Sequence, residues 1–422
     1  MTLMQRNFCC LLAIAALFPA LGQSATTRPT SAPTSMLAAM PGDQIPDRLL
    51  GGESVRIDVD HAPVQVSWAL PGADKLAPRP QPFQRLSRNF QIDASGTELE
   101  RGVSVPLSAP GAMLHISPRD SASAPLSAAQ VYLTVQGQRH SAGRFAGSMA
   151  SGSSMAQAGM SVQPGSIAMR LDDSVGAGTI RVDAQGARGH YLIQVREPQS
   201  PFALVLVADR DTRLAGQAVE FRAHLRQPAD TARVDAVSGV LEAPDGWSTN
   251  IDFAPMPDQS YVARIRPAAA HAGQRGLWQV HVFASGHAGR QVLLRDASNA
   301  FAAVRPTARF NGHLRRQANR PGGDLAIEVG IEAAAASRYA IAGVLYGHDG
   351  HGALKPAVYA QSADWLTPGN DRHIILLFDA DAVARSGLQA PFELHDLRLD
   401  DQVQLGLLER RQVAARGIPA ND

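Results

Sequence analysis

The residue types that could bind a metal come closest together at His348-Asp349-Gly350-His351. Two imidazoles and a carboxylate at this spacing could hold zinc or copper. The same run contains Asp-Gly, a preferred pair at a β-hairpin turn, where flanking histidines need no ligand. We favour the turn, assign no metal, and keep His348, Asp349 and His351 only as candidate ligands.

Three acidic pairs offer carboxylates that calcium could use: Asp172-Asp173, Asp379 with Asp381, and Asp400-Asp401. A calcium site takes six or more oxygen ligands, and no pair has the spacing of a calcium loop. Aspartates are also frequent helix N-caps and turn residues. We therefore expect Asp379 or Asp381 to cap a short helix that ends near Gly387, and the other two pairs to lie in turns.

Tryptophan side chains could stack on a sugar ring or anchor a protein partner. Trp247 and Trp365 each stand beside turn residues, so both are candidate binding residues. For Trp365 a core position is the more usual one in a β-sandwich, whereas core and binding are evenly matched for Trp247. Trp68 and Trp278 lie in alternating strand patterns, and we expect both in the core.

The common catalytic motifs are missing from this sequence. It contains no His-Glu-x-x-His, no Gly-x-Ser-x-Gly, no Ser-x-x-Lys and no phosphate-binding loop. The 13 histidines and many serines leave a Ser-His-Asp arrangement open, because such triads are recognised by geometry rather than by sequence position. We assign no catalytic residue and no cofactor.

The elements that would position these residues begin after a segment with the layout of a secretory signal peptide. Met1–Asn7 carries one charge, Phe8–Phe18 is an unbroken apolar run, and Pro19 with small residues follows. A transmembrane helix needs about 20 apolar residues, so this run is too short to span a bilayer. We expect residues 1–25 to be removed, and the mature chain to be exported to the periplasm or the medium.

Composition narrows the classes of partner. Both cysteines, Cys9 and Cys10, fall within residues 1–25, so the mature chain has no thiol chemistry. Lys and Arg total 39 against 38 Asp and Glu, a net charge of +1, without the basic surplus that favours nucleic acid. No later apolar run is long enough to cross a membrane. We expect a protein, a glycan or a cell-envelope component as partner, and no nucleic acid.

A Thr-, Ser- and Pro-rich segment at residues 26–44 reads as a flexible linker before a first β-rich domain at residues 45–198. Alternation of apolar and polar residues predicts strands there, including Val55–Val59, Val64–Trp68 and Tyr191–Val195. Ser141–Gly165 is rich in Gly, Ser, Ala and Met. We expect it to be the least ordered internal segment.

Two more domains follow at residues 199–305 and 306–422. Each contains short strands separated by turns over roughly 100 residues, which is typical of an immunoglobulin-like sandwich. We expect a mainly β protein of three β-rich domains, the second and third being immunoglobulin-like sandwiches. In the third, Gly347–Gly352 is expected as a hairpin tip, Gln402–Leu408 as a strand and Ala380–Gly387 as a short helix.

This organisation resembles the bacterial domain-of-unknown-function family 4785. The resemblance rests on the strand and turn residues at the end of the first domain and in the last one: Tyr191–Pro198, Trp365-Leu366-Thr367-Pro368-Gly369 and Pro391–Asp400. It covers nearly all of the mature chain. It implies an exported protein with a small N-terminal domain and two immunoglobulin-like domains, and it implies no activity and no catalytic residue.

The sequence therefore favours a non-enzymatic binding or interaction module that acts in the periplasm or outside the cell. The alternative is a secreted hydrolase, or an accessory module of one, with its site in the first domain near Ser141–Gly165. A deep pocket there with convergent polar groups would favour the hydrolase. A shallow surface with exposed tryptophan or an open sheet edge would favour binding. A self-associating envelope protein is a third possibility.

Overall fold

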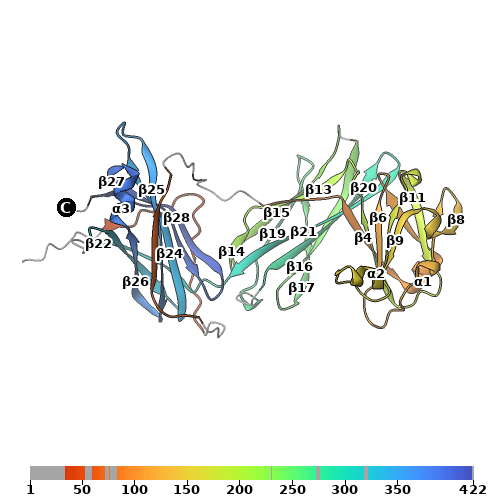
Figure 1. The fold of residues 1–422 in the computed structure, drawn as a ribbon, viewed down its shortest axis with the longest axis horizontal. Coiled ribbons are helices and arrows are strands. Elements are labelled where there is room, and N and C mark those ends of the chain that lie inside the picture. Colours follow the sequence, from red (N-terminus) through yellow and green to blue (C-terminus); the bar gives the residue numbers. More distant parts are fainter. Residues whose placement is uncertain are drawn as a thin grey trace, which may run out of the picture.

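Three β-sandwiches lie in a row, with the first at the right of Figure 1 and the third at the left. The computed structural model describes residues 34–52, 59–71, 76, 83–229, 231–271, 276–317 and 322–420. The expected signal peptide and most of the strand expected at Val55–Val59 fall outside these ranges. The mainly β fold class with several sandwiches is confirmed.

The first sandwich packs a sheet in the order β4-β12-β6-β10-β9 against one in the order β5-β11-β7-β8. Its elements are β4 (Asn89–Ser95), α1 (Gly96–Arg101), β5 (Val103–Leu107), β6 (Met113–Pro118), β7 (Val131–Val135), β8 (Gln138–Ser141), β9 (Ala146–Ser151), α2 (Gly152–Gln157), β10 (Ile167–Leu171), β11 (Gly178–Ala184) and β12 (His190–Arg196). Alternation decides which side chains enter the core: Val131, Leu133 and Val135 of β7 are buried, whereas Tyr132 and Thr134 are half-buried.

The second sandwich packs β17-β16-β20-β21, with β14 also on β21, against β18-β19-β15-β13-β3. Its strands are β3 (Gln84–Ser87), β13 (Ala203–Ala208), β14 (Thr212–Leu214), β15 (Val219–Arg226), β16 (Ala232–Glu242), β17 (Ser248–Asp252), β18 (Ala254–Pro255), β19 (Tyr261–Ile265), β20 (Trp278–Ala288) and β21 (Gln291–Val304). Strand β21 is longer than the short strands expected in this domain and runs without a break through Val292 and Phe301. Trp278 is buried in the core, as expected.

The third sandwich packs β1-β22-β23-β26 against β2-β25-β24-β27-β28. Its elements are β1 (Thr34–Ser35), β2 (Val64–Ala69), β22 (Ala308–Gln317), β23 (Leu325–Ala333), β24 (Ser337–His348), β25 (Leu354–Leu366), β26 (Gly369–Phe378), α3 (Ala380–Ser386), β27 (Gln389–Asp401) and β28 (Gly406–Ile418). The expected short helix is confirmed as α3. The last strand begins four residues later than expected, because residues 402–405 form the turn after β27.

The N-terminal segment lies in the third sandwich, which differs from the linker and domain start expected at residues 26–44 and 45–198. Strand β1 pairs with β22, and β2 pairs with β25 along its whole length. Between them Gln44 pairs with Arg410 of β28 and donates through Nε2 to the carbonyl of Leu407 at 2.7 Å. Sheet edges present unpaired backbone groups, and this segment satisfies part of them.

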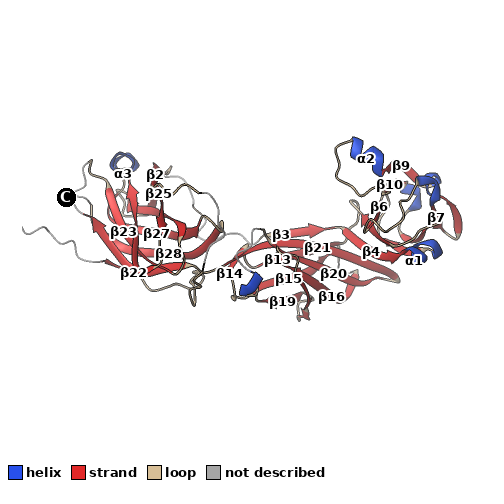
Figure 2. Cartoon of the chain, turned by 90° about the horizontal axis from the view of Figure 1, so that it is seen from below, coloured by secondary structure: helices blue, strands red, loops and turns tan. Residues whose placement is uncertain are grey.

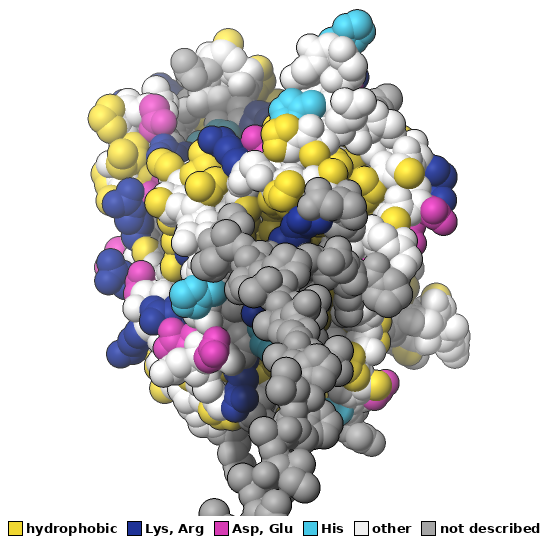
Figure 3. Space-filling view, turned by 90° about the vertical axis from the view of Figure 1, so that its left-hand side faces the viewer, with side chains coloured by type: hydrophobic (Ala, Val, Ile, Leu, Met, Phe, Trp, Pro, Cys, Tyr) yellow, Lys and Arg dark blue, Asp and Glu magenta, His cyan; other side chains and the backbone are white. Residues whose placement is uncertain are grey.

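Trp68 corrects another expectation, because its side chain is 49% exposed rather than in the core. Strand β2 is the edge strand of its sheet, and Val64, Val66 and Trp68 all lie on its solvent face. Trp68 is covered only in part by Tyr359 of the neighbouring strand, with ring centroids 4.5 Å apart. Hydrophobic side chains reach the surface at this end of the molecule (Figure 3).

Ser141–Gly165 is also more regular than expected. It contains strand β9, which pairs with β10, and helix α2, whose N-cap is Ser151. The Gly152 N–H donates to the carbonyl of Ser166 at 2.7 Å, which holds the start of α2 against the beginning of β10. Figure 2 shows α2 projecting from the first sandwich beside β9 and β10. Small residues leave the strand pattern weak, but the pairing with β10 compensates.

The first two sandwiches are joined by a buried ion pair. Arg295 Nη1 of β21 lies 2.8 Å from Glu197 Oε2, just after β12, and the two side chains are 1% and 0% exposed. Arg295 also donates to the carbonyl of Phe202 at 3.0 Å, and Glu197 accepts from the N–H of Ser108 at 2.5 Å. Beside this pair, Asp296 of β21 pairs with Asn89 of β4, so one sheet continues across the junction.

Candidate functional site

The four-residue run His348-Asp349-Gly350-His351 caps the hairpin between β24 and β25. The Asp349 carboxylate accepts from the N–H groups of His351 and Ala353, both at 2.9 Å, and pairs with Lys355 Nζ at 2.8 Å. These contacts lower the pKa of Asp349 to about 2, with Lys355 the largest cause. The imidazole of His348 is bonded through Nδ1 to the carbonyl of Pro391. The hairpin thus uses this carboxylate in turn chemistry.

The acidic pairs occupy separate places. Asp379 is the N-cap of α3, and its Oδ1 accepts from the N–H of Ala382 at 2.7 Å. Asp401 is buried and accepts from the hydroxyls of Ser337 and Thr307. Asp400 lies within β27 and not in a turn, which corrects the expectation for that residue. In the parts of the chain that the structure describes, no three His, Cys, Asp or Glu side chains gather as a metal site would require.

Trp247 lies at the edge of the second sandwich and is 39% exposed. Its ring stacks on His271, with centroids 4.7 Å apart, and stands edge-on to Trp278 at 6.3 Å. Asp245 Oδ2 lies 2.7 Å from His271 Nδ1, a contact that lowers the pKa of the aspartate. One face of the Trp247 ring is therefore already covered by His271.

Trp365 is half-buried at the end of β25. Its ring stacks on His61, with centroids 3.8 Å apart and an interplanar angle of 18°. Arg338 holds the same N-terminal segment by donating to the carbonyls of Asp60 and Ala62. The structure does not bring Trp365 and Trp247 together, since they belong to different sandwiches.

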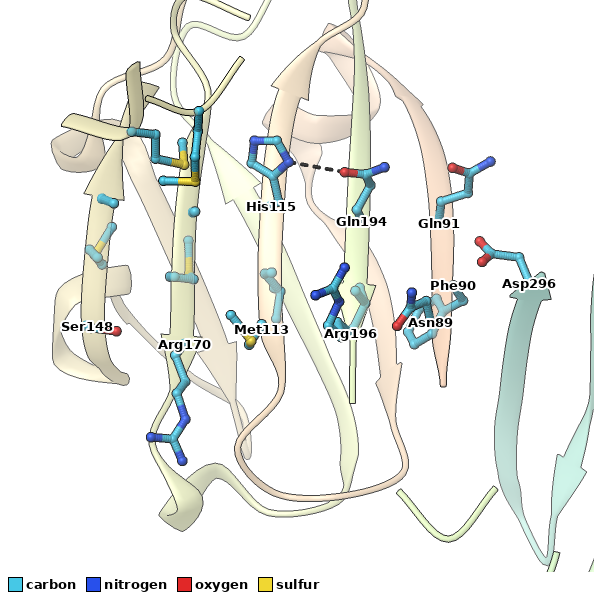
Figure 4. A pocket seen from close by; sticks show the side chains of 18 of the residues that line it. Asn89, Phe90, Gln91, Met113, His115, Ser148, Arg170, Gln194, Arg196 and Asp296 are labelled. Atoms are coloured by element: carbon cyan, nitrogen blue, oxygen red, sulfur yellow. Dashed lines mark hydrogen bonds between the residues drawn. The ribbon is translucent and has the colours of Figure 1, made fainter. Parts of the chain in front are cut away.

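A large concavity lies where the first and second sandwiches meet. We call it the junction groove; its volume is about 660 Å³, and its lining combines five methionines with side chains of β4, β6, β12, β20 and β21. Its polar and methionine members are Asn89, Gln91, Met113, His115, Ser148, Met149, Met155, Met160, Met169, Arg170, Gln194, Arg196, His281, Asp296 and Ser298. Figure 4 shows the polar side chains of β4, β6, β10 and β12 beside one another, with Asp296 of β21 at one end.

Strand register arranges the polar residues of the groove in two rows that cross the strands. In one row Gln91 lies opposite Gln194, which lies opposite His115, and His115 lies opposite Ala168. The other row, two residues further along each strand, consists of Asn89, Arg196, Met113, Arg170 and Ser148. Side chains two residues apart on a strand share a face, so both rows point into the groove. Both can be followed in Figure 4.

Methionines form the wall at the β9 end of the groove. Met155 belongs to α2 and is 5% exposed, while Met160 follows the helix and is 50% exposed. The Met160 N–H donates to the carbonyl of Met155 at 3.0 Å, which keeps the two together. At this end of the groove the row positions on β9 and β10 carry only the short side chains of Ala150 and Ala168.

The polar groups of the groove are incompletely paired. His115 Nδ1 lies 3.1 Å from Gln194 Oε1, whereas its Nε2 is shielded from solvent and has no hydrogen-bond partner in the described chain. Arg170 reaches Asp173 at 3.6 Å, and no carboxylate of the described residues pairs with Arg196. At the other end, burial raises the pKa of Asp296, and the charges of His281 and Arg295 oppose that shift.

A serine and a histidine meet beside Asp296. Ser298 Oγ lies 2.9 Å from His281 Nδ1, and Glu242 Oε2 lies 3.8 Å from His281 Nε2. These three residue types could form a nucleophile, a base and an orienting carboxylate. Their strands, β21, β20 and β16, are neighbours in one sheet, however, and the backbone N–H groups of paired strands lie in the plane of the sheet. No backbone donors of these strands therefore point to the space above Ser298 where an oxyanion would develop.

The sequence placed the site of the hydrolase alternative near Ser141–Gly165, the segment that contains Met149, Met155 and Met160, but gave no sign of the polar side of the groove. His115, Gln194 and Arg196 stand at solvent positions of alternating strands, where polar residues need no special explanation. The available signal was the run of polar residues at every second position of two strands that pair. That signal becomes specific only when register is known.

Comparison with known proteins assigns the family. Residues 56–197 match the model of the N-terminal domain of a domain of unknown function, DUF4785, and residues 307–416 match its C-terminal domain. The two matches together span more than half of the chain. The chain belongs to the DUF4785 family. The resemblance seen in the sequence is thus confirmed, and no curated protein matches the chain.

A crystal structure of a DUF4785 family protein from Legionella pneumophila has the same fold, with a TM-score of 0.69 at 18% identity over 88% of this chain and 99% of that one. Trypsin-activated alpha-2-macroglobulin from Escherichia coli matches with a TM-score of 0.20 at 14% identity over 74% of this chain and 22% of its own. A marsupial T cell receptor matches with a TM-score of 0.21 at 10% identity, covering 69% and 99%. The last two likenesses are too low to carry an argument. Within the described ranges, no helix has the length and apolar character needed to span a bilayer.

Proposed function

We propose that this member of the DUF4785 family is an exported, non-enzymatic binding protein whose ligand occupies the junction groove. The observation that carries the proposal is the unpartnered Nε2 of His115 within two rows of polar side chains. Leaving a shielded polar atom unpaired costs about 1–3 kcal/mol, which a ligand hydrogen bond removes. The volume of about 660 Å³ also falls within the range of ligand sites.

Export is part of the proposal and is supported by the N-terminal sequence alone. Met1–Asn7, Phe8–Phe18 and the small residues that follow have the three-part layout of a signal peptide. The mature chain would then act in the periplasm or outside the cell. N-terminal sequencing of the protein from a periplasmic fraction tests this, and a chain that keeps residues 1–25 would contradict it.

The binding role is tested by filling the groove. In the variant Ala168→Trp an indole occupies the row position opposite His115 in the groove, whereas Ala353→Trp places the same group on an exposed turn of the third sandwich. Immobilised mature wild type and both variants are exposed to cell-envelope extract and culture medium of the source cells. Material retained by wild type and Ala353→Trp but lost with Ala168→Trp supports the proposal. Equal retention by all three overturns it.

A secreted hydrolase is the second candidate, and the contact between Ser298 and His281 is the observation in its favour. The backbone N–H groups of β16, β20 and β21 supply no oxyanion hole above Ser298. Such a hole is usually the largest single contribution to this kind of catalysis. We therefore expect p-nitrophenyl acetate to be hydrolysed by wild type no faster than by Ser298→Ala. A rate that falls about 100-fold or more in Ser298→Ala would favour the hydrolase instead.

A further inference from the structure

We infer that the ligand of the junction groove is an extended peptide of about seven residues with a free carboxylate, recognised by the two polar rows and the methionine wall. This inference rests on the proposed binding function and adds the chemical class of the ligand. It follows from three features that the sheet places side by side: paired amide side chains, a flexible apolar wall and an arginine without a counter-ion.

The length follows from the sheet. The groove crosses six neighbouring strands in the order β21-β4-β12-β6-β10-β9. Strands lie about 4.8 Å apart, so the five spaces between them span about 24 Å. An extended peptide rises about 3.4 Å per residue, which gives about seven residues for a segment that lies along the rows.

The rows suit a peptide backbone because their side chains both donate and accept. Gln91, Gln194 and Asn89 each carry an amide with two donors and a carbonyl acceptor. A backbone that runs along them presents the same two functions, N–H and C=O, in alternation, and these amides can pair with either. His115 donates through Nδ1 to Gln194 at 3.1 Å, so its unpartnered Nε2 is an acceptor for a peptide N–H.

The β9 end of the groove suits an apolar side chain of variable shape. Met155 and Met160 line the same groove as Ala150 and Ala168, whose methyl side chains occupy little of its space. Figure 4 shows yellow sulfur atoms beside the strands that carry Ser148 and Arg170. Methionine is flexible and polarisable, and surfaces built from it accept many apolar partners. This end therefore selects for an apolar residue without fixing its identity.

The charge of the groove suits a C-terminal carboxylate near Arg170 on β10, one strand from the β9 end, with Arg196 on β12 adding positive charge from the same row. Arg196 stands between Asn89 and Met113 in its row, is exposed, and has no ion pair among the described residues. Arg170 lies on the other side of Met113 in the same row and reaches only the exposed Asp173 at 3.6 Å. An arginine fork binds a carboxylate through two parallel hydrogen bonds. Asp296, the single carboxylate among the lining residues, stands at the other end of the groove, where its charge repels an acid.

Glycans and acyl chains fit the groove less well. Sugar sites depend on an aromatic platform, and the only aromatic ring among the lining residues other than histidine is Phe90, which is 2% exposed and packed in the core. An acyl chain would cover the amides of both rows without pairing them, and each unpaired polar group costs free energy. A peptide satisfies the rows and fills the methionine wall together.

The test uses mixtures of synthetic heptapeptides, randomised at every position except for the omission of cysteine, in two matched sets. One set ends in a free carboxylate and the other in an amide. Immobilised mature protein is incubated with both sets, and retained peptides are counted by mass spectrometry. The proteins are wild type, Ala168→Trp, Arg196→Gln, and the controls Ala353→Trp and Arg226→Gln, whose side chains are exposed outside the groove.

We expect wild type and both controls to enrich carboxylate peptides over amidated ones, and Ala168→Trp to enrich neither set. Arg196→Gln should lose the preference for the carboxylate, about tenfold in enrichment, because a charge-assisted hydrogen bond is removed. Wild type that retains no peptide beyond the level of Ala168→Trp overturns the inference.

Radiolabelled decanoate and maltohexaose on the same columns separate the two proposals. Retention of either one by wild type, with loss in Ala168→Trp, overturns the peptide inference while the binding function stands. Retention of no probe through the groove by any of these proteins counts against both.

Discussion

At the scale of single residues, burial raises the pKa values of two carboxyl groups, Asp400 and Asp296. Asp400 lies on β27, and desolvation raises its pKa to about 6, with Arg398 opposing the shift only in part. A folded-state pKa above the ordinary value of 3.8 means that the folded protein binds this proton more tightly. The tighter binding of this proton stabilises the folded state relative to the unfolded one. That stabilisation is complete below pH 3.8 and is lost as the pH rises through about 6.

Asp400→Asn should therefore raise the free energy of unfolding of the third sandwich at pH 7 by about 1–3 kcal/mol, and the gain should vanish towards pH 4. Hydrogen exchange of β24 amides, corrected for the intrinsic rate at each pH, measures it. The exposed Asp252→Asn on the second sandwich is the matched control. A variant no more stable than wild type at pH 7 would show that the buried charge is compensated.

Asp296 gives the junction groove its own pH dependence. Burial raises the pKa of Asp296, opposed by His281 on β20 and by Arg295 beside it. Its negative charge opposes a carboxylate ligand, so binding should strengthen as the pH falls through this raised pKa. Asp296→Asn should bind carboxylate heptapeptides about twofold to fivefold more tightly at pH 7, with a flatter pH profile. Fluorescence titration from pH 5 to 8 checks this, and superimposable profiles would contradict it.

Residue patterns predicted the strands well where alternation was strong. Val131–Val135 and Tyr191–Val195 are strands whose apolar side chains enter the core. The prediction that Trp68 lies in the core was wrong, because alternation marks the two faces of a strand without indicating which face is covered. Groove residues such as His115 and Arg196 could not be found for the same reason, since a polar residue on a strand is ordinary until its neighbours on other strands are known.

At the scale of elements, the junction of the first two sandwiches depends on the pair of Arg295 and Glu197, and Arg295 precedes the groove residue Asp296 on β21. Both side chains are fully buried, and both make further hydrogen bonds to Ser108. Removing one partner of a buried pair leaves an uncompensated charge, at a cost of about 3–5 kcal/mol. Replacing both partners with apolar groups avoids that charge.

Arg295→Met alone should destabilise the first two sandwiches by about 3–5 kcal/mol, and Arg295→Met with Glu197→Leu should recover much of the loss. Urea unfolding followed by hydrogen exchange in β12 and β21 measures the effect. Arg226→Gln, an exposed change on β15, is the control. If the double variant is no more stable than Arg295→Met, the two residues do not act as a pair.

The pairing of elements was predictable only when it was local. The hairpin between β24 and β25 turns at an Asp-Gly pair, and α3 begins at an Asp N-cap and ends at Gly387 in the left-handed region. Strand β2 pairs with β25, almost 300 residues later in the chain. No local sequence pattern, such as a turn between the two strands, indicates a contact over that separation. The sequence therefore led us to expect Val64–Trp68 in the first domain, whereas β2 pairs with a strand of the third sandwich.

At the scale of the whole molecule, the chain is nested. It starts in the third sandwich with β1 and β2, passes through the second with β3, builds the first from β4 to β12, and then returns through the second to the third. Two sandwiches thus contain strands from both ends of the chain. The first sandwich lies at one end of the row and is joined to the rest by the strands that lead to it and away from it (Figure 1).

Nesting makes the third sandwich depend on the N-terminal segment. Without residues 34–71, β25 and β22 lose the strands that pair with their outer edges, and Gln44 no longer pairs with β28. Exposed strand edges favour aggregation.

A fragment of residues 306–422 should therefore be poorly soluble or unfolded alone, and should fold when residues 34–71 are fused to it through a glycine-serine linker. Circular dichroism and dispersion of amide resonances compare the two, with residues 83–120 fused through the same linker as the control. The contrary result is a fragment 306–422 that melts cooperatively at the same temperature with and without residues 34–71. It would show that β1 and β2 add no stability to the third sandwich.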